Sequence, residues 1–189
     1  MNIIVKPYGS SSCYCRPDTT WERENKDLYV PECVSRLYWT PILFARICKA
    51  GKCVGGKFAS RYYDAFNYGA LLYCHTDESS DMASSSCYDH TSLLPAPLYN
   101  PVVMENADNI YEVRKKEEIL FRTPDSGVAG KEMIEAAICL ASQKTSLRIG
   151  DFIAVELAPQ SLLADRNEEN VELNARFCEN SLYDIKLIF

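Results

Sequence analysis

Strand-like segments separated by turn signals dominate this chain and constrain its fold more than any other feature. Short stretches rich in Val, Ile, Tyr and Phe alternate with clusters of Gly, Pro and Asp along most of the sequence. Such spacing is typical of antiparallel β proteins. The final segment alternates most regularly, because Tyr183, Ile185 and Leu187 would share one strand face. The expected strands are 28–30, 38–48, 68–75, 119–121, 152–157, 171–177 and 183–189.

Helical periodicity is clear in one segment. Between Lys131 and Ser142 the apolar residues Ile134, Ile138 and Ala141 recur with the spacing of one helix face. A second, shorter helix is expected within residues 55–63. The sequence therefore predicts a mostly β (α+β) fold with few helices.

The length of the chain sets its domain organisation. A chain of 189 residues suits one domain with a substantial core, and no internal repeat divides it. We expect a single domain over residues 1–189. Residues 78–100 contain a serine-rich run and lack a clear strand or helix pattern, so an irregular loop region is expected there.

Composition excludes some partners and compartments. The chain has 20 Lys and Arg against 26 Asp and Glu, a net charge of −6, which disfavours a nucleic-acid partner. No run approaches the roughly 18 apolar residues that span a bilayer, so no membrane association is expected. The N-terminus lacks a signal-peptide pattern, so we expect a cytoplasmic protein. Its 9 cysteines are then expected to be free thiols.

Local motifs for chemistry are sparse. Cys13 and Cys15 are not followed by a second pair at the spacing of a structural zinc site. Cys74 or Cys87 could pair with His90 as a nucleophile and base, although satisfied polar side chains near a loop are the commoner explanation. Phosphate-binding glycine loops are absent from the sequence. The residues alone therefore predict a soluble, β-rich domain.

One stretch carries a more specific resemblance. Arg46-Ile-Cys-Lys-Ala-Gly-Lys-Cys53, then Lys57-Phe-Ala-Ser-Arg-Tyr-Tyr-Asp64 and Gly69, resembles the central segment of fumarylacetoacetate hydrolase (FAH) family proteins, including 2-hydroxyhepta-2,4-diene-1,7-dioate isomerases. Cys15-Arg-Pro-Asp-Thr19 and Leu147-Arg-Ile-Gly-Asp-Phe-Ile153 resemble further family segments in the same order. The resemblance implies an FAH-like multi-sheet β-roll or sandwich, a homodimer and a shortened N-terminus.

The resemblance also implies a metal site, and this chain departs from it. Family members hold Mg²⁺ or Ca²⁺ with a Glu-x-Glu pair on the first core strand and an Asp on the next. These positions fall on Thr40, Ile42 and Leu71, and a family lysine falls on Ser86. One hydroxyl and two hydrocarbon side chains cannot replace three carboxylates around a hard cation. We therefore expect a vestigial pocket without metal or other cofactor. Pro41, between the first two positions, suggests a bulge or a strand edge.

Three functional hypotheses remain open. The leading one is a protein without metal-dependent catalysis, with a binding or interaction role as a homodimer or as the partner of an active homologue. The alternative is an active hydrolase, isomerase or decarboxylase that acts on acylpyruvate-like or diketo acids. Its rebuilt site would draw on His75, Asp77 and Glu156, because a carboxylate near a histidine can transfer protons.

The third hypothesis is a scaffold that only assembles. It would use a tyrosine-rich surface around Tyr62, Tyr63 and Tyr68. A pocket with converging polar groups would favour an enzyme, and a flat or filled one would favour the other two hypotheses.

Overall fold

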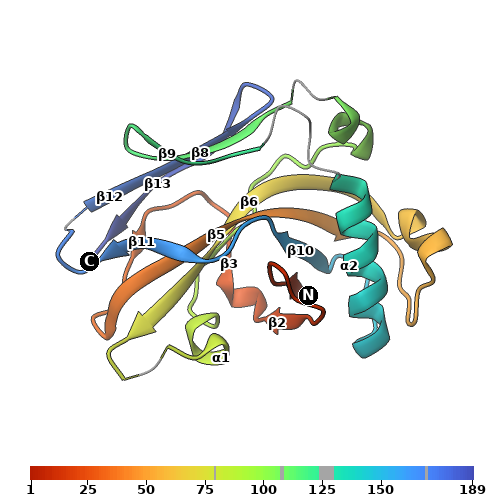
Figure 1. The fold of residues 1–189 in the computed structure, drawn as a ribbon, viewed down its shortest axis with the longest axis horizontal. Coiled ribbons are helices and arrows are strands. Elements are labelled where there is room, and N and C mark those ends of the chain that lie inside the picture. The colour runs from red at the N-terminus through yellow and green to blue at the C-terminus, as the bar shows by residue number, and fades with distance from the viewer. Residues whose placement is uncertain (79, 107–108, 124–129, 169) are drawn as a thin grey trace.

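Two β-sheets packed against each other make up most of the molecule in this computed structural model, which describes residues 1–78, 80–106, 109–123, 130–168 and 170–189 (Figure 1). The larger sheet has the strand order β2-β1-β10-β5-β6-β7-β3, with β11 also paired to β5. Its strands are β1 (Ile3–Lys6), β2 (Tyr14–Arg16), β3 (Trp21–Glu22), β5 (Val34–Ile47), β6 (Tyr63–Thr76), β7 (Ser92–Leu93), β10 (Phe152–Glu156) and β11 (Ser161–Asp165).

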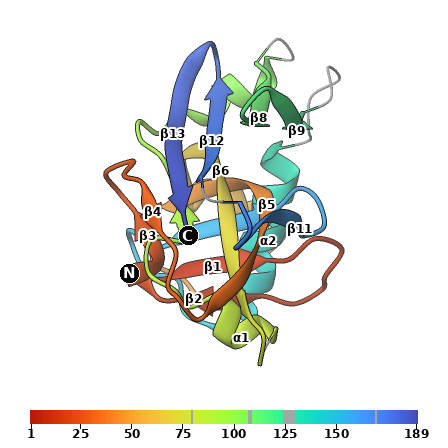
Figure 2. The ribbon, with the colours of Figure 1, turned by 90° about the vertical axis from the view of Figure 1, so that its left-hand side faces the viewer.

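The smaller sheet has the order β4-β13-β12-β8-β9. It lies across one face of the larger sheet, and β1 and β2 lie on the other side of the β5–β6 pair (Figures 1 and 2). The expected mostly β, multi-sheet fold is confirmed. The strands of the smaller sheet are β4 (Leu28–Tyr29), β8 (Tyr111–Lys115), β9 (Glu118–Arg122), β12 (Asn170–Phe177) and β13 (Asn180–Ile188).

The described helical segments are few. The helix predicted at residues 131–142 is confirmed as α2 (Gly130–Lys144), whose Ile134, Ile138 and Ala141 are buried as the periodicity predicted. The short helix expected within 55–63 is the 3₁₀ helix η2 (Gly56–Arg61). The remaining helical segments are α1 (Met82–Ser85), η1 (Asp18–Thr20) and η3 (Pro101–Glu105).

The antiparallel pair β5–β6 organises the core. Each strand has 14 residues, longer than the sequence pattern indicated, and η2 lies between them in the chain. Because successive side chains point to opposite faces, the pair contributes to two apolar clusters. The main core takes Leu43 and Ala45 together with α2 and the smaller sheet. The inner core takes the alternate residues; its members are Ile3, Val5, Ile42, Phe44, Leu71, Tyr73, Leu94, Phe152 and Ala154.

Pro41 does not cause a bulge, which was one of the two features expected at this position. It pairs with Ala70 in regular register, and the register shifts of β5 lie elsewhere, between Val34 and Arg36 and between Arg46 and Ile47. The carbonyl of Pro41 accepts a hydrogen bond from the Leu157 amide at 2.9 Å, on the side away from β6. On that side β5 changes its partner from β10 to β11. Pro41 therefore lies at the gap between the β5–β10 and β5–β11 pairings. No backbone donor is required there, so the missing N–H of proline costs no hydrogen bond.

Residues 78–100 contain little regular structure among the positions described. They include α1 and the two-residue strand β7, while position 79 lies outside the described residues. A side chain at Gly69 would collide with the carbonyl of Leu93, so this glycine permits the close approach of β7 to β6. In the described part of the chain, no helix is long and apolar enough to cross a membrane.

Candidate functional site

The three positions that resemble metal-ligand positions lie together on one face of the larger sheet. Thr40 on β5 is directly opposite Leu71 on β6, and Ile42 follows two residues after Thr40 on the same face. All three side chains are 0% exposed. The fold therefore gathers these positions at one place, although their chemistry is not that of a cation site.

Hydrocarbon fills this place. Ile42 and Leu71 belong to the inner core, where Phe152 packs edge-on against Phe44 with ring centroids 5.5 Å apart. The hydroxyl of Thr40 donates to the Ala158 carbonyl at 2.7 Å and so caps the loop between β10 and β11. The residues do not fit a metal, because the available oxygen is already bonded and the other two side chains have none. Over the described residues, no group of three or more His, Cys, Asp and Glu side chains could hold a metal ion.

A buried polar network borders the inner core. Glu156 pairs across the strands with Ile42 and is 3% exposed, so its carboxylate lies on the same face as the three positions. One carboxylate oxygen accepts a hydrogen bond from the Tyr73 hydroxyl and the other from the Tyr8 amide, at 2.9 Å for the latter. The Tyr14 hydroxyl lies 2.7 Å from that of Tyr73. The chain itself therefore satisfies this carboxylate.

Burial keeps the phenols of this network neutral. Desolvation raises the pKa of Tyr14 to about 12, against the opposing effect of the nearby Arg16 charge. Desolvation likewise raises the pKa of Tyr73 far above its ordinary value, and the neighbouring Tyr14 and Glu156 add to the shift. Both hydroxyls therefore stay available as hydrogen-bond donors throughout the neutral pH range.

Arg16 brings a positive charge to the same place. Its guanidinium is 1% exposed and lies over the Tyr73 ring, 5.1 Å from the centroid. Its Nη2 donates to the Leu72 carbonyl at 2.8 Å and to the Thr91 hydroxyl at 2.7 Å. Among the described residues Nε and Nη1 have no hydrogen-bond partner. The Arg16 charge and the Glu156 charge act in opposite directions on the pKa values of Tyr14 and Tyr73.

The remaining sequence candidates are dispersed. Ser86 is buried at the end of α1, and its hydroxyl donates to the Ala83 carbonyl at 3.3 Å. His75 lies near the end of β6, which continues to Thr76. Its ring stacks on Tyr38 at 4.4 Å between centroids, and burial lowers its pKa. Asp77 is exposed. Within the described contacts, none joins any two of His75, Asp77 and Glu156.

The prediction of a tyrosine-rich surface around Tyr62, Tyr63 and Tyr68 was wrong. Tyr63 and Tyr68 are buried, and Tyr68 stacks on Tyr111 within the main core at 4.7 Å between ring centroids. Only Tyr62 of the three is partly accessible. Tyrosines in strands commonly place their rings in the core and satisfy the hydroxyl locally, so their number does not indicate a surface.

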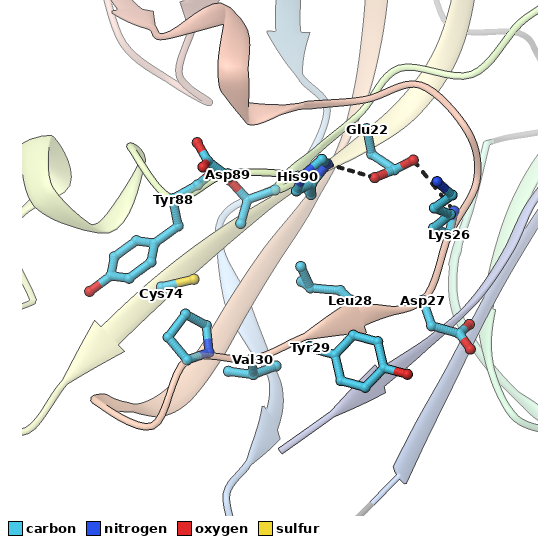
Figure 3. A pocket seen from close by; sticks show the side chains of 12 residues that line it. Glu22, Lys26, Asp27, Leu28, Tyr29, Val30, Cys74, Tyr88, Asp89 and His90 are labelled. Atoms are coloured by element: carbon cyan, nitrogen blue, oxygen red, sulfur yellow. Dashed lines mark hydrogen bonds and ion pairs between the residues drawn. The ribbon is translucent and has the colours of Figure 1, made fainter.

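Sequence reasoning missed the polar network and did not predict a surface hollow, although Cys74 and His90, which it named as a candidate pair, both line that hollow. Tyr73 follows Leu71 by two residues, and Glu156 ends an apolar strand, so a strand-face analysis could have grouped them. Figure 3 shows the hollow, which has a volume of about 630 Å³ and lies beside β4. Its lining includes Glu22 and His90, whose Nδ1 lies 2.8 Å from the Glu22 carboxylate. This contact joins two residues that are 68 positions apart in the sequence, so no local sequence pattern predicted it.

Several solved structures share this fold. Fumarylpyruvate hydrolase from Pseudomonas aeruginosa, solved with Mn²⁺ and pyruvate, superposes with a TM-score of 0.77 at 12% identity, covering 100% of this chain and 90% of that one. 5-Carboxymethyl-2-hydroxymuconate delta-isomerase from Mycobacterium smegmatis gives 0.78 at 11% identity, covering 99% and 78%. A Yersinia pestis CO92 protein described as a member of the FAH family gives 0.75 at 12%, covering 99% and 92%.

These likenesses define the class of fold. The chain has the fold of FAH family proteins, as its sequence motifs predicted. Identities of 10–14% show the fold alone. No family model matches the sequence. No curated protein matches it either.

Proposed function

We propose that this protein uses the FAH-like fold without metal-dependent catalysis and serves as a binding or interaction protein. One observation carries the proposal. At two of the three positions where the resemblance places metal-binding carboxylates, Ile42 and Leu71 are 0% exposed and packed in an apolar cluster. A cation placed there would lose its water without gaining ligands.

The polar groups nearby support the same conclusion. Glu156 is the carboxylate closest in register to these positions, and its two oxygens already accept hydrogen bonds from Tyr73 and Tyr8. The charge of the Arg16 guanidinium, buried against Tyr73, would repel a divalent cation. A metal would have to displace these contacts as well as hydrocarbon.

The proposal separates fold from chemistry. The structures that share the fold include a hydrolase solved with Mn²⁺ and pyruvate and an isomerase. One fold can carry different sites, and activity follows the residues of the site. We propose that this protein acts in the cytoplasm as a homodimer or as the partner of an active homologue.

Two measurements on the unmodified protein test the proposal. Titration calorimetry with Mg²⁺, Ca²⁺ and Mn²⁺ should give no saturable heat at micromolar to low millimolar metal. Turnover of fumarylpyruvate and of simple acylpyruvates should stay at the rate of a metal-free blank, with the Pseudomonas fumarylpyruvate hydrolase as positive control. Stoichiometric micromolar metal binding, or turnover that a chelator abolishes, would refute the proposal.

A metal-independent enzyme is the second candidate. Glu156 and His75 lie on the same sheet face on either side of Tyr73, an arrangement that could move a proton. Turnover of an acylpyruvate that persists in chelator and is lost in Glu156→Gln would favour this candidate. Equal rates for the parent and Glu156→Gln would count against it.

A further inference from the structure

The hollow beside β4 is separate from the positions discussed above. Its apolar wall is made by Leu28, Val30 and Cys74, which belong to the main core. Leu71 and Tyr73 belong to the inner core on the opposite face of the sheet. Any role of this β4 hollow is therefore independent of whether the protein uses a metal.

The size and lining of the β4 hollow suit a small molecule. Its volume of about 630 Å³ lies within the range of roughly 300–1,000 Å³ that is usual for ligand pockets. Figure 3 shows Leu28, Val30 and Cys74 on one side and His90, Glu22 and Lys26 on the other. Desolvation raises the pKa of the Cys74 thiol to about 12, so this thiol contributes as an uncharged wall and not as a nucleophile.

The polar contact in the hollow is a histidine oriented by a buried carboxylate. The Glu22 side chain is 7% exposed, and its Oε1 accepts the Glu24 amide at 2.7 Å. Its Oε2 lies 2.8 Å from Nδ1 of His90, whose side chain is 61% exposed. A carboxylate at Nδ1 fixes the ring and leaves Nε2 as the nitrogen for another partner. No described hydrogen bond engages Nε2.

The backbone at this point is also unusual. His90 has φ of +60°, in the left-handed region that few non-glycine residues adopt. Its amide donates to the Thr19 carbonyl at 3.3 Å, so both its backbone and its ring are held by residues far away in the sequence. Uncommon backbone conformations that the surrounding structure holds in place are frequent at ligand-binding sites.

Charges around the hollow restrict the ligand. The acidic residues Glu22, Asp27 and Asp89 are among those that line it, and the amine of Lys26 is already paired with Glu24. An anionic ligand would meet net negative charge here. A hydroxyl group suits Nε2 in either charge state of the ring, since it donates to a neutral imidazole and accepts from a protonated one.

We propose that the β4 hollow binds a small neutral molecule with an apolar, ring-sized body and one hydroxyl group, of the phenol class. The body packs on Leu28, Val30 and Cys74. The hydroxyl bonds Nε2 of His90, and Glu22 acts as the positioning residue for the ring.

A pair of probes separates the apolar and polar contributions. 2-Naphthol and naphthalene have the same ring body and differ in the hydroxyl. Calorimetry or fluorescence titration should show 1:1 binding of 2-naphthol to the parent protein, with naphthalene roughly tenfold weaker, the value of one net hydrogen bond. Backbone amide NMR shifts caused by 2-naphthol should centre on residues 28–30 and 88–91.

Four variants complete the test. His90→Gly, which suits the left-handed backbone, should weaken 2-naphthol about tenfold and leave naphthalene unchanged. Val30→Trp should abolish binding of both probes by filling the hollow. Glu22→Gln should change the ¹⁵N shifts of the His90 ring and weaken 2-naphthol but not naphthalene, whereas a purely structural role would weaken both probes alike. His75→Gln serves as the control, because it changes a histidine on the opposite face of the sheet. This variant should bind both probes as the parent protein does.

Three outcomes would overturn the proposal. The first is no saturable binding of 2-naphthol to the folded parent protein up to its solubility limit. The second is binding that survives Val30→Trp or shifts amides elsewhere, since the ligand would then lie outside the hollow. The third is an equal loss of both probes in folded His90→Gly, because His90 would then not contact the hydroxyl. Circular dichroism of each variant establishes that it is folded.

Discussion

A single carboxylate placed at Ile42, one of the positions that resemble metal-ligand positions, is the sharpest test of the apolar packing found there. Ile42→Glu replaces a side chain that is 0% exposed and sits opposite Glu156 across the strands. Removing the buried hydrocarbon costs about 1.5–3 kcal/mol. The new carboxyl must also stay protonated or lie as a second charge beside Glu156, since residues opposite each other in a sheet are only about 5 Å apart.

The charge contribution can be estimated from linkage. Keeping a carboxyl with an unfolded pKa of about 4.3 protonated costs about 1.4 kcal/mol per pH unit, or about 5 kcal/mol at pH 8. Adding the hydrocarbon loss gives a total destabilisation of roughly 6–8 kcal/mol. Local relaxation should reduce this total, but we expect the loss to remain about 4 kcal/mol or more. A domain of this size is stable by only about 5–15 kcal/mol in total, so the variant should lose a large share of its stability at pH 8.

The stability of the Ile42→Glu variant should depend on pH. Burial raises the folded-state pKa of the introduced carboxyl above its unfolded value, so the variant loses stability relative to the parent as pH rises. Between pH 5.5 and pH 8 the deficit should grow by up to about 3 kcal/mol. Urea unfolding followed by circular dichroism at both pH values measures it.

Two matched controls isolate the cause. Ile42→Gln has the same shape without a titrating group, and its deficit should not depend on pH. Leu162→Glu adds the same charge at a side chain that is 52% exposed and should change stability by less than about 1 kcal/mol. If Ile42→Glu stays within about 1 kcal/mol of the parent at pH 8, the position is not filled as described.

Further expectations concern the polar network, the thiols and assembly. Tyr73→Phe should destabilise the protein by about 1.5–3 kcal/mol in urea unfolding, since it leaves the buried Glu156 carboxylate short of a donor; a neutral effect would mean that water replaces the hydroxyl. Thiol titration of the denatured, unreduced protein should find all 9 cysteines. In the native protein Cys74 should react last, because it is buried and desolvation raises its pKa to about 12; prompt labelling of Cys74 would contradict this. Sedimentation should show a dimer of the 21.4 kDa chain, and a monomer over a wide concentration range would exclude it.

The sequence by itself determined the class of fold. Strand alternation and the periodicity of Ile134, Ile138 and Ala141 depend only on near neighbours, so a mostly β fold with a late helix could be predicted. Strand periodicity also predicted that Thr40 and Ile42 share a face, because alternation along a strand follows from local backbone geometry. That Leu71 lies beside them was implied by the family resemblance, not by local geometry.

Tertiary structure alone decided what surrounds those positions. The strand-face argument did not reveal that Tyr73 and Tyr8 would engage Glu156, or that Arg16 would lie over the Tyr73 ring. The strand lengths, the regular path at Pro41 and the burial of Tyr68 were likewise set by neighbours from distant segments. Glu22 and His90 meet only because β3 and β7 pair side by side. Contacts between distant segments depend on how the sheets pack, and this information is spread over the whole chain.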